Sequence, residues 1–183
     1  MIAIVDYGAG NLKSVKKAFD HLGAEVTVTS RPEVIEAADK VVLPGVGHFS
    51  ALSALDRDGL RDVLMNTAHE GKPFLGICLG MQWLFEGRCR AFSVAVKSPH
   101  VGWNSLNVRR ESQLLRGIAA DSFVYYTHSF QAPVVDGTTA SSEYGAPFSA
   151  VVEEKNIFGV QFHPEKSWTV GLAMLKNFCE TGP

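Results

Sequence analysis

The first 85 residues alternate between short apolar runs and segments with helical periodicity, and this alternation constrains the fold more than any other feature of the sequence. The segments predicted as strands are residues 2–6, 25–29, 40–43 and 73–77. The segments predicted as helices are residues 12–22, 32–38 and 60–68. Strands joined by helical crossovers run parallel, so this half predicts an α/β fold with an open, twisted, mostly parallel sheet and helices on both faces.

The second half changes texture, because strand-like segments follow one another with little helix between them. This pattern predicts an antiparallel extension of the same sheet, closed by a helix over residues 172–178. The strand-like segments are residues 92–96, 105–109, 123–126, 138–142, 149–153 and 157–162. A chain of 183 residues without an internal repeat or a Pro/Gly/Ser-rich linker suits one unit, so we expect residues 1–183 to form a single domain.

The composition excludes several classes of function. A net charge of −2 and a pI near 6.3 argue against a nucleic-acid binder, and no apolar run approaches the ~18 residues of a membrane span. The first residues lack the basic segment of a signal peptide, and three cysteines are too few for a disulfide framework, so we expect a cytoplasmic protein. The sequence has no CxxC or HExxH motif, and Gly8 and Gly10 lack the third glycine of a dinucleotide fingerprint, so we expect neither a metal nor a cofactor.

The sharpest local motif is Gly-Ile-Cys-Leu-Gly at residues 76–80, between a predicted strand and a segment that can start a helix. Small residues two positions before and after a nucleophile allow the strained turn known as a nucleophile elbow, so Cys78 is a candidate nucleophile. The turn also places the thiol at a helix N-terminus, where the helix dipole favours the thiolate. The alternative is a buried, inert cysteine that only packs, which is our interpretation of Cys89 and Cys179.

A thiolate nucleophile needs a general acid and base, and the base needs an orienting partner. His163 directly follows the last predicted strand, and Glu165 is two residues further on. Cys78 and His163 both end apolar strands, and the carboxyl ends of parallel strands meet at one edge of a sheet. We therefore expect Cys78, His163 and Glu165 to form a catalytic triad, whereas the alternative for His163 and Glu165 is a solvated turn.

A glycine-rich loop, Pro-Gly-Val-Gly at residues 44–47, directly follows another predicted strand. Glycines let backbone N–H groups approach a ligand closely, and acyl chemistry needs donors aimed at a developing oxyanion. The candidate oxyanion donors are therefore Gly45, Val46, Gly47 and the backbone N–H of Leu79. The alternative is an ordinary glycine-rich turn. His100 and His128 fall in predicted loops beside aromatic residues and are further candidates for lining a site.

Taken together, the motifs resemble those of the triad-type, class I glutamine amidotransferases. The matching pieces are PGVG at 44–47, GICLGMQ at 76–82 and FHPE at 162–165. Four more pieces are similar to the branch of that family that serves histidine biosynthesis. They are DYGAGNL at 6–12, PHVGWN at 99–104, THSF at 127–130 and HPEKS at 163–167.

The resemblance implies a reaction. Cys78 attacks the side-chain amide of L-glutamine, His163 protonates the leaving ammonia, and water then releases glutamate from the thioester. The ammonia passes to a separate (βα)₈-barrel cyclase subunit in a heterodimer. That subunit forms imidazole glycerol phosphate and an aminoimidazole carboxamide ribotide.

The resemblance also assigns residues around the triad. It implies that the substrate is contacted by Gly47, Gln82, Glu86, His128, Ser129 and Phe130, the last standing where a tyrosine is common. It implies that the partner subunit is contacted by Asn11, Trp103 and Lys166. The open alternatives are a glutaminase subunit that serves another acceptor, which residues 99–104 disfavour, a stand-alone cysteine hydrolase, and a scaffold without activity.

Overall fold

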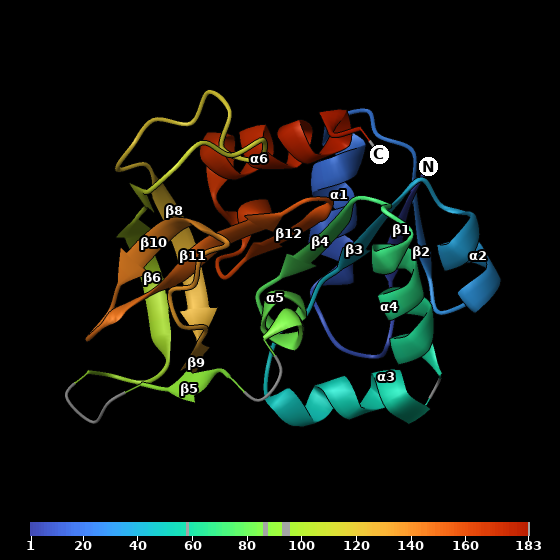
Figure 1. Ribbon diagram of the computed structural model, residues 1–183, viewed down its shortest axis with the longest axis horizontal. Helices are drawn as coiled ribbons and strands as arrows, with labels where there is room; N and C mark the ends of the chain where they lie inside the picture. Colours follow the sequence, from blue (N-terminus) through green and yellow to red (C-terminus); the bar gives the residue numbers. More distant parts are fainter. Residues whose placement is uncertain (58, 86–87, 93–95, 183) are drawn as a thin grey trace.

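The structure is a computed structural model that describes residues 1–57, 59–85, 88–92 and 96–182 (Figure 1). The elements of the first half are β1 (Ile2–Val5), α1 (Leu12–His21), β2 (Val26–Thr29), α2 (Pro32–Ala37), β3 (Lys40–Leu43), the short helix η1 (Phe49–Leu52), α3 (Ser53–Arg57), α4 (Leu60–His69), β4 (Phe74–Ile77) and α5 (Leu79–Leu84). Those of the second half are β5 (Arg90–Ala91), β6 (His100–Ser105), β7 (Asn107–Val108), β8 (Phe123–His128), β9 (Phe130–Gln131), β10 (Thr138–Glu143), β11 (Pro147–Glu154), β12 (Ile157–Val160), the short helix η2 (Pro164–Lys166) and α6 (Trp168–Glu180).

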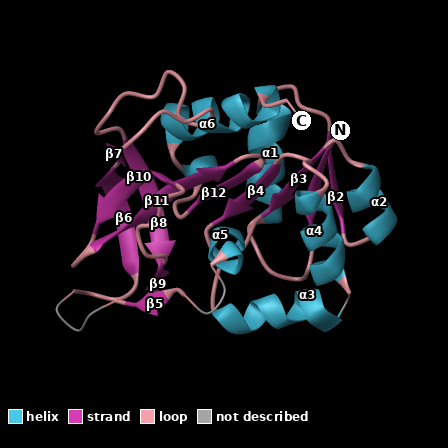
Figure 2. Cartoon of the chain, viewed as in Figure 1, coloured by secondary structure: helices cyan, strands magenta, loops and turns pink. Residues whose placement is uncertain are grey.

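Eight strands form the main sheet, in the order β2-β1-β3-β4-β12-β11-β10-β7. The pairings from β2 to β12 are parallel, and those from β12 to β7 are antiparallel. This confirms the mostly parallel sheet with an antiparallel extension (Figure 2). Within that order β4 and β12 are neighbours, so the strand before Cys78 and the strand before His163 lie side by side.

Both faces of the inner parallel strands β1, β3, β4 and β12 are buried, which explains their apolar runs. On one face Ile4 packs in a core with Phe19 of α1 and Phe178 of α6. On the other face Val5 packs in a second core with Leu64 of α4. Figure 1 shows α6 above the strands and α5 and α3 below them. None of the helices in the described part of the chain is long and apolar enough to cross a membrane.

Two predictions for the second half are wrong. Of the predicted strand at 105–109, only Asn107–Val108 form a strand, β7. Ser105 is instead the last residue of β6, a strand that the sequence pattern did not predict. The predicted strand at 123–126 belongs to β8, which pairs with β6 in a separate two-stranded ribbon and not with the main sheet. Val101 and Trp103 lie on the exposed face of this ribbon, so β6 lacks the alternation of buried apolar and exposed polar residues that reveals a strand.

The predicted strand at 92–96 falls partly on residues 93–95, which lie outside the described residues. Phe92 and Val96 are not in a strand, and the nearest strand is β5, which pairs with β9. The helices η1 and α3 were not predicted either. They follow the loop at 44–47 and thus help to shape the edge of the sheet where β3 and β4 end.

Candidate active site

Cys78 occupies a strained turn between β4 and α5. Its φ of 53° and ψ of −104° lie in a region that residues with a side chain rarely adopt. The backbone N–H of Cys78 donates to the Val160 carbonyl oxygen of β12 (2.7 Å), and its carbonyl accepts from the N–H of Gln82 (3.0 Å). The turn is therefore tied to the neighbouring strand and to the helix that follows, as a nucleophile elbow requires.

The two glycines of the motif are required by close backbone contacts. A Cβ atom on Gly76 would lie 2.6 Å from the carbonyl oxygen of Gly80. A Cβ atom on Gly80 would overlap the carbonyl oxygen of Leu43. Since neither contact involves a flexible side chain, any larger residue must displace backbone at the elbow.

We expect the substitution Gly80→Ala to lower the free energy of unfolding by about 1–3 kcal/mol, the usual cost of overpacking. The matched control is Gly137→Ala, because a Cβ atom on Gly137 meets nothing closer than 3.9 Å. That variant should stay within about 0.5 kcal/mol of the wild type. Chemical denaturation followed by circular dichroism measures both changes, and equal midpoints for the two variants would contradict the steric argument.

His163 and Glu165 form a buried pair at the end of β12. The Nδ1 of His163 lies 2.9 Å from Oε1 of Glu165, and each side chain is only 1% exposed. A carboxylate only accepts, so Nδ1 carries the hydrogen and Nε2 is left for the nucleophile. Within the described residues this Nε2 has no hydrogen-bond partner. The backbone N–H of His163 donates to the carbonyl oxygen of Tyr125 in β8 (2.9 Å), which fixes the start of the turn.

The surroundings of His163 favour its charged form. Burial by itself favours the neutral ring, but the neighbouring Cys78 sulfur and the Glu165 carboxylate outweigh burial and raise the pKa of His163 to about 9. The imidazolium is therefore the main form at neutral pH. An imidazolium beside a cysteine is the arrangement that sustains a thiolate nucleophile.

Gln161 is a site residue that the sequence analysis missed. Its Nε2 lies 3.7 Å from the Sγ of Cys78, and its Oε1 accepts from Nε2 of Gln82 (3.0 Å). The Sγ also lies 3.8 Å from the carbonyl oxygen of Thr127. The signal was available, because Gln161 is a polar residue in an apolar run, two positions before His163 and thus on the same side of an extended chain.

A cavity of about 240 Å³ lies beside the loop at 44–47. Several of the predicted site residues line this cavity. His48, Pro99 and Thr127 also line it and were not predicted. Its lining residues are Val46, Gly47, His48, Pro99, Thr127, His128, Ser129 and Phe130. Gln82 lies behind this wall, where its Nε2 donates to the Phe130 carbonyl oxygen (2.8 Å). The predicted contact Glu86 lies outside the described residues.

Two of the candidate oxyanion residues, Gly45 and Leu79, are in contact. The N–H of Leu79 donates to the carbonyl oxygen of Gly45 over 3.3 Å, so this donor is occupied by the loop. Gly47 has a φ of 106°, a conformation that favours glycine. The loop is therefore placed against the elbow, with the Gly45 carbonyl on the N–H of Leu79.

Two of the three predicted interface residues share a neighbour. Nζ of Lys166 lies 6.0 Å from the centre of the Tyr125 ring, and the Trp103 ring is 5.8 Å from that same ring. Asn11 immediately precedes α1, which contacts η2. His100 and His128, expected in loops, instead lie opposite each other on β6 and β8.

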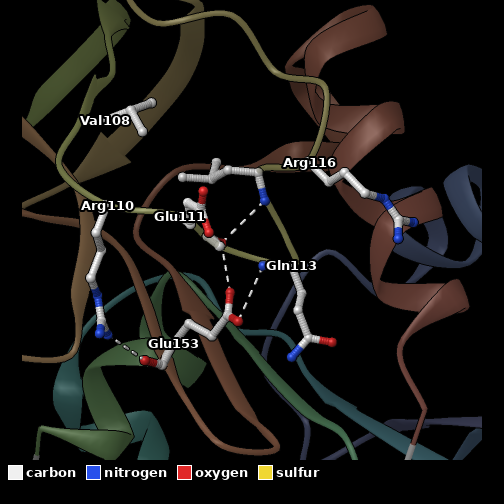
Figure 3. A pocket seen from close by; sticks show the side chains of 8 residues that line it. Val108, Arg110, Glu111, Gln113, Arg116 and Glu153 are labelled. Carbon is white, nitrogen blue, oxygen red and sulfur yellow. Dashed lines mark hydrogen bonds between the residues drawn. The ribbon is translucent and has the colours of Figure 1, made fainter.

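A larger cavity, of about 540 Å³, lies away from the triad (Figure 3). There Glu153 binds a loop to β11: its carboxylate accepts from the Ser112 hydroxyl (2.6 Å) and the Gln113 N–H (3.1 Å). Arg110 donates to the backbone carbonyl of Glu153 (2.9 Å). These contacts hold the loop, and the lining residues include neither a cysteine nor a histidine. The smaller cavity is therefore the candidate active site, because its lining residue Thr127 lies against the sulfur of Cys78.

Comparisons with known proteins show the family of the chain. The family model described as glutamine amidotransferase class-I matches residues 3–181. The imidazole glycerol phosphate synthase subunit HisH of Methanothermobacter thermautotrophicus is 46% identical over 197 residues, covering 98% of this chain and 98% of that protein. The HisH subunit of Bacillus cereus strain B4264 is 45% identical over 195 residues, covering 97% and 93%.

Solved structures share the fold at low sequence identity. PurLQS from Thermotoga maritima matches with a TM-score of 0.77 and 19% identity, over 97% of this chain and 96% of that one. The glutaminase domain of Trypanosoma brucei CTPS with bound acivicin matches with a TM-score of 0.71 and 14% identity, over 100% and 94%.

Proposed function

We propose that this chain, which belongs to the class I glutamine amidotransferase family and within it to the HisH subunits of imidazole glycerol phosphate synthase, hydrolyses L-glutamine with the triad Cys78, His163 and Glu165. The observation that carries the proposal is the buried His163–Glu165 pair. Cys78 and Glu165 raise the pKa of the His163 ring, and no described residue forms a hydrogen bond with its Nε2. Glutamine occupies the cavity beside the elbow.

In the first step the Cys78 thiolate attacks the side-chain carbonyl carbon of glutamine. The carbonyl electrons move to oxygen, and His163 donates its Nε2 proton to the nitrogen as the carbon–nitrogen bond breaks. Ammonia leaves and a thioester remains on Cys78. Gln161 keeps the sulfur in place through its Nε2, and Glu165 keeps the ring oriented through Nδ1.

In the second step water hydrolyses the thioester. His163, now neutral, takes a proton from the water at Nε2, and the hydroxyl adds to the thioester carbon. The carbon–sulfur bond then breaks, so glutamate leaves and the thiolate–imidazolium pair is restored. The buried Glu165 carboxylate stabilises the imidazolium at both stages without itself taking the proton.

Both steps pass through an oxyanion, and the resting loop is not arranged to bind it. The Leu79 N–H donates to the Gly45 carbonyl. Rotation of the peptide between Gly45 and Val46 would release the Leu79 N–H and turn the Val46 N–H toward the substrate oxygen. One lost oxyanion donor costs roughly 10²–10³ in rate, so this single peptide is enough to hold the enzyme in a slow state.

The ammonia passes to a (βα)₈-barrel cyclase subunit, with which the chain forms a heterodimer. We place the interface with this subunit on the exposed face of the β6–β8 ribbon, because large apolar side chains lie there beside the candidate active site. In the ribbon Val101 is 57% exposed and Phe123 59%. Trp168, the first residue of α6, is 77% exposed, and its ring lies 4.9 Å from that of Trp103 in the ribbon. Exposed apolar groups of this size are typical of a protein–protein contact. We also place the enzyme in the cytoplasm, where Cys78 stays reduced.

The test of the proposal is a glutaminase assay on the chain alone, on the complex with the cyclase subunit, and on the complex with the nucleotide that the cyclase consumes. We expect slow hydrolysis by the chain alone and rapid hydrolysis in the loaded complex. A free chain that already turns over at the rate of the loaded complex would contradict the switching loop and would favour a stand-alone hydrolase.

Trp103→Ala and Lys166→Ala should each reduce the stimulated rate about tenfold and the basal rate less than twofold. The reason is that both residues act through the partner and not on the reacting atoms, and an interface contact of this kind is worth about 1.4 kcal/mol. Glutaminase rates with and without the cyclase and its ligand check this. The matched control is Lys176→Ala, an exposed lysine of α6 paired with Glu180. Equal loss of both rates in the Trp103 or Lys166 variant would contradict an interface role.

A further inference from the structure

Two buried histidines, His100 and His128, form a hydrogen-bonded pair behind the candidate glutamine cavity. They lie directly opposite each other in the β6–β8 ribbon. Nδ1 of His100 is 3.0 Å from Nε2 of His128, and Nδ1 of His128 is 2.8 Å from the carbonyl oxygen of Phe130. The pair therefore connects the ribbon to the segment 128–130 that lines the cavity.

The direction of these hydrogen bonds follows from their last acceptor. A carbonyl oxygen only accepts, so Nδ1 of His128 carries a hydrogen. Burial lowers the pKa of His128 to about 3 and that of His100 to about 4, so both rings are neutral at physiological pH and each carries one hydrogen. Nε2 of His128 is then a bare acceptor, and the hydrogen between the rings belongs to Nδ1 of His100.

The ring of His100 is held between two tyrosines. The Tyr144 ring is stacked on it at 4.0 Å and 11°, and the Tyr126 ring is stacked at 4.8 Å and 16°. The Tyr126 hydroxyl is bonded to the Ser142 hydroxyl (2.7 Å), and the Tyr144 hydroxyl donates to the Lys97 carbonyl (2.7 Å). Both faces of the His100 ring are thus covered, which fixes the direction in which its Nδ1 donates.

The Phe130 carbonyl is where this pair meets the residues around the nucleophile. It accepts a second hydrogen bond from Nε2 of Gln82 (2.8 Å). The same Gln82 nitrogen donates to Gln161, whose own Nε2 lies 3.7 Å from the sulfur of Cys78. A shift of this carbonyl would therefore move both the cavity wall and the Gln82 side chain.

We propose that His100 is a positioning residue: its Nδ1 hydrogen holds His128 in the Nδ1–H tautomer, and this tautomer fixes the Phe130 carbonyl and the glutamine-binding segment 128–130. The part about glutamine rests on the proposed function. Both ring nitrogens of His128 are engaged within the protein, so His128 supports the segment and offers no free nitrogen to the substrate.

The first test is the tautomeric state, read by long-range ¹H–¹⁵N NMR on the full chain labelled with ¹⁵N-histidine. In the wild type, both His100 and His128 should show the Nδ1–H tautomer, whereas the exposed His69 serves as a solvent reference. The variant His100→Phe keeps the aromatic stack but lacks the Nδ1–H donor. In this variant His128 should no longer show the Nδ1–H tautomer alone. A wild-type His128 in the Nε2–H form would overturn the proposal. This measurement depends neither on enzyme activity nor on a variant.

The second test is the kinetics of the complex with the cyclase subunit and its nucleotide. His100→Phe should raise the KM for glutamine about tenfold and change kcat less than threefold, because the substrate segment and not the triad is disturbed. His100→Asn, whose side-chain amide nitrogen takes the place of Nδ1, should restore KM to within about threefold of the wild type. His69→Phe is the control for a histidine replaced at the surface.

The two tests separate two kinds of failure. A folded His100→Phe complex with an unchanged KM would overturn the positioning role, as would a His100→Asn variant no better than His100→Phe. A wild-type complex that does not hydrolyse glutamine would refute the proposed function. In that case the NMR spectrum would still decide whether His100 sets the tautomer of His128.

Discussion

The variant Cys78→Ala is expected to lose glutamine-dependent synthesis by roughly 10⁶-fold, the size of effect seen when a triad nucleophile is removed. Synthesis from free ammonia by the complex should stay within twofold of the wild type, because the thiol acts only in the hydrolysis. The two rates are measured on the same preparation, with glutamine or an ammonium salt as the nitrogen source. Alanine fills less volume at the elbow, so the turn between β4 and α5 has no new steric conflict.

The matched control for this experiment is Cys179→Ala, which removes a thiol from the packed face of α6. Its glutamine-dependent rate should be unchanged within about threefold. A Cys78→Ala complex that assembles normally but also fails with free ammonia would show that Cys78 supports more than hydrolysis, and the division of labour between the subunits would then be wrong.

His163→Ala should reduce the glutaminase kcat by roughly 10⁶-fold and Glu165→Gln by roughly 10⁴-fold, because an amide can still accept from Nδ1 whereas nothing replaces the missing acid and base. The effects are not additive, since the three residues act as one unit. Single-turnover and steady-state rates of the loaded complex check the order. If Glu165→Gln were the more harmful change, Glu165 would not be an orienting residue.

The same pair of residues gives a pH dependence with a defined sign. His163 must be protonated to release ammonia, and its pKa is about 9, so glutaminase activity should fall as the pH rises through about 9. In Glu165→Gln one of the negative charges that raise this pKa is removed, and the alkaline limit should move to lower pH. The raised pKa of His163 also contributes to the stability of the fold. This contribution is fully present when the pH is below the pKa of the unfolded state, near 6.5, and it is lost as the pH rises through about 9. An alkaline limit that does not move in Glu165→Gln would contradict the electrostatic role of the carboxylate.

The sequence revealed the parallel half of the fold because its inner strands are buried on both faces and leave apolar runs. It failed at β6, where Val101 and Trp103 put apolar side chains on the exposed face. That failure has a physical cause. β6 lies in the proposed interface, and a surface that binds a partner subunit has an apolar composition like that of a core. The sequence pattern therefore predicts burial correctly only where an apolar residue packs against other residues of the same chain.

The strained turn at Cys78 and the place of His163 after a strand were predictable from the local sequence, because such a turn needs glycines at fixed spacing and His163 follows an apolar run. The supporting contacts were not. Gln161 reaches Cys78 only because β12 is the neighbour of β4, and His100 reaches His128 only through the β6–β8 register. The hydrogen bond from Leu79 to Gly45 is one of two arrangements open to the same residues, and a sequence does not choose between conformations of one loop.

The place of β12 in the sheet also has a consequence for biosynthesis. This strand is translated about 80 residues after β4, yet it lies in the middle of the sheet, between β4 and β11. The proposed nucleophile at residue 78 and its proposed acid at residue 163 therefore meet only after the segment between them has been translated, and closing so long a loop makes that pairing a late event in folding. An unfinished or prematurely terminated chain lacks the second half of the triad. The order of the strands thus means that a fragment ending before β12 contains the proposed nucleophile without its acid and base, and we expect such a fragment to release no ammonia.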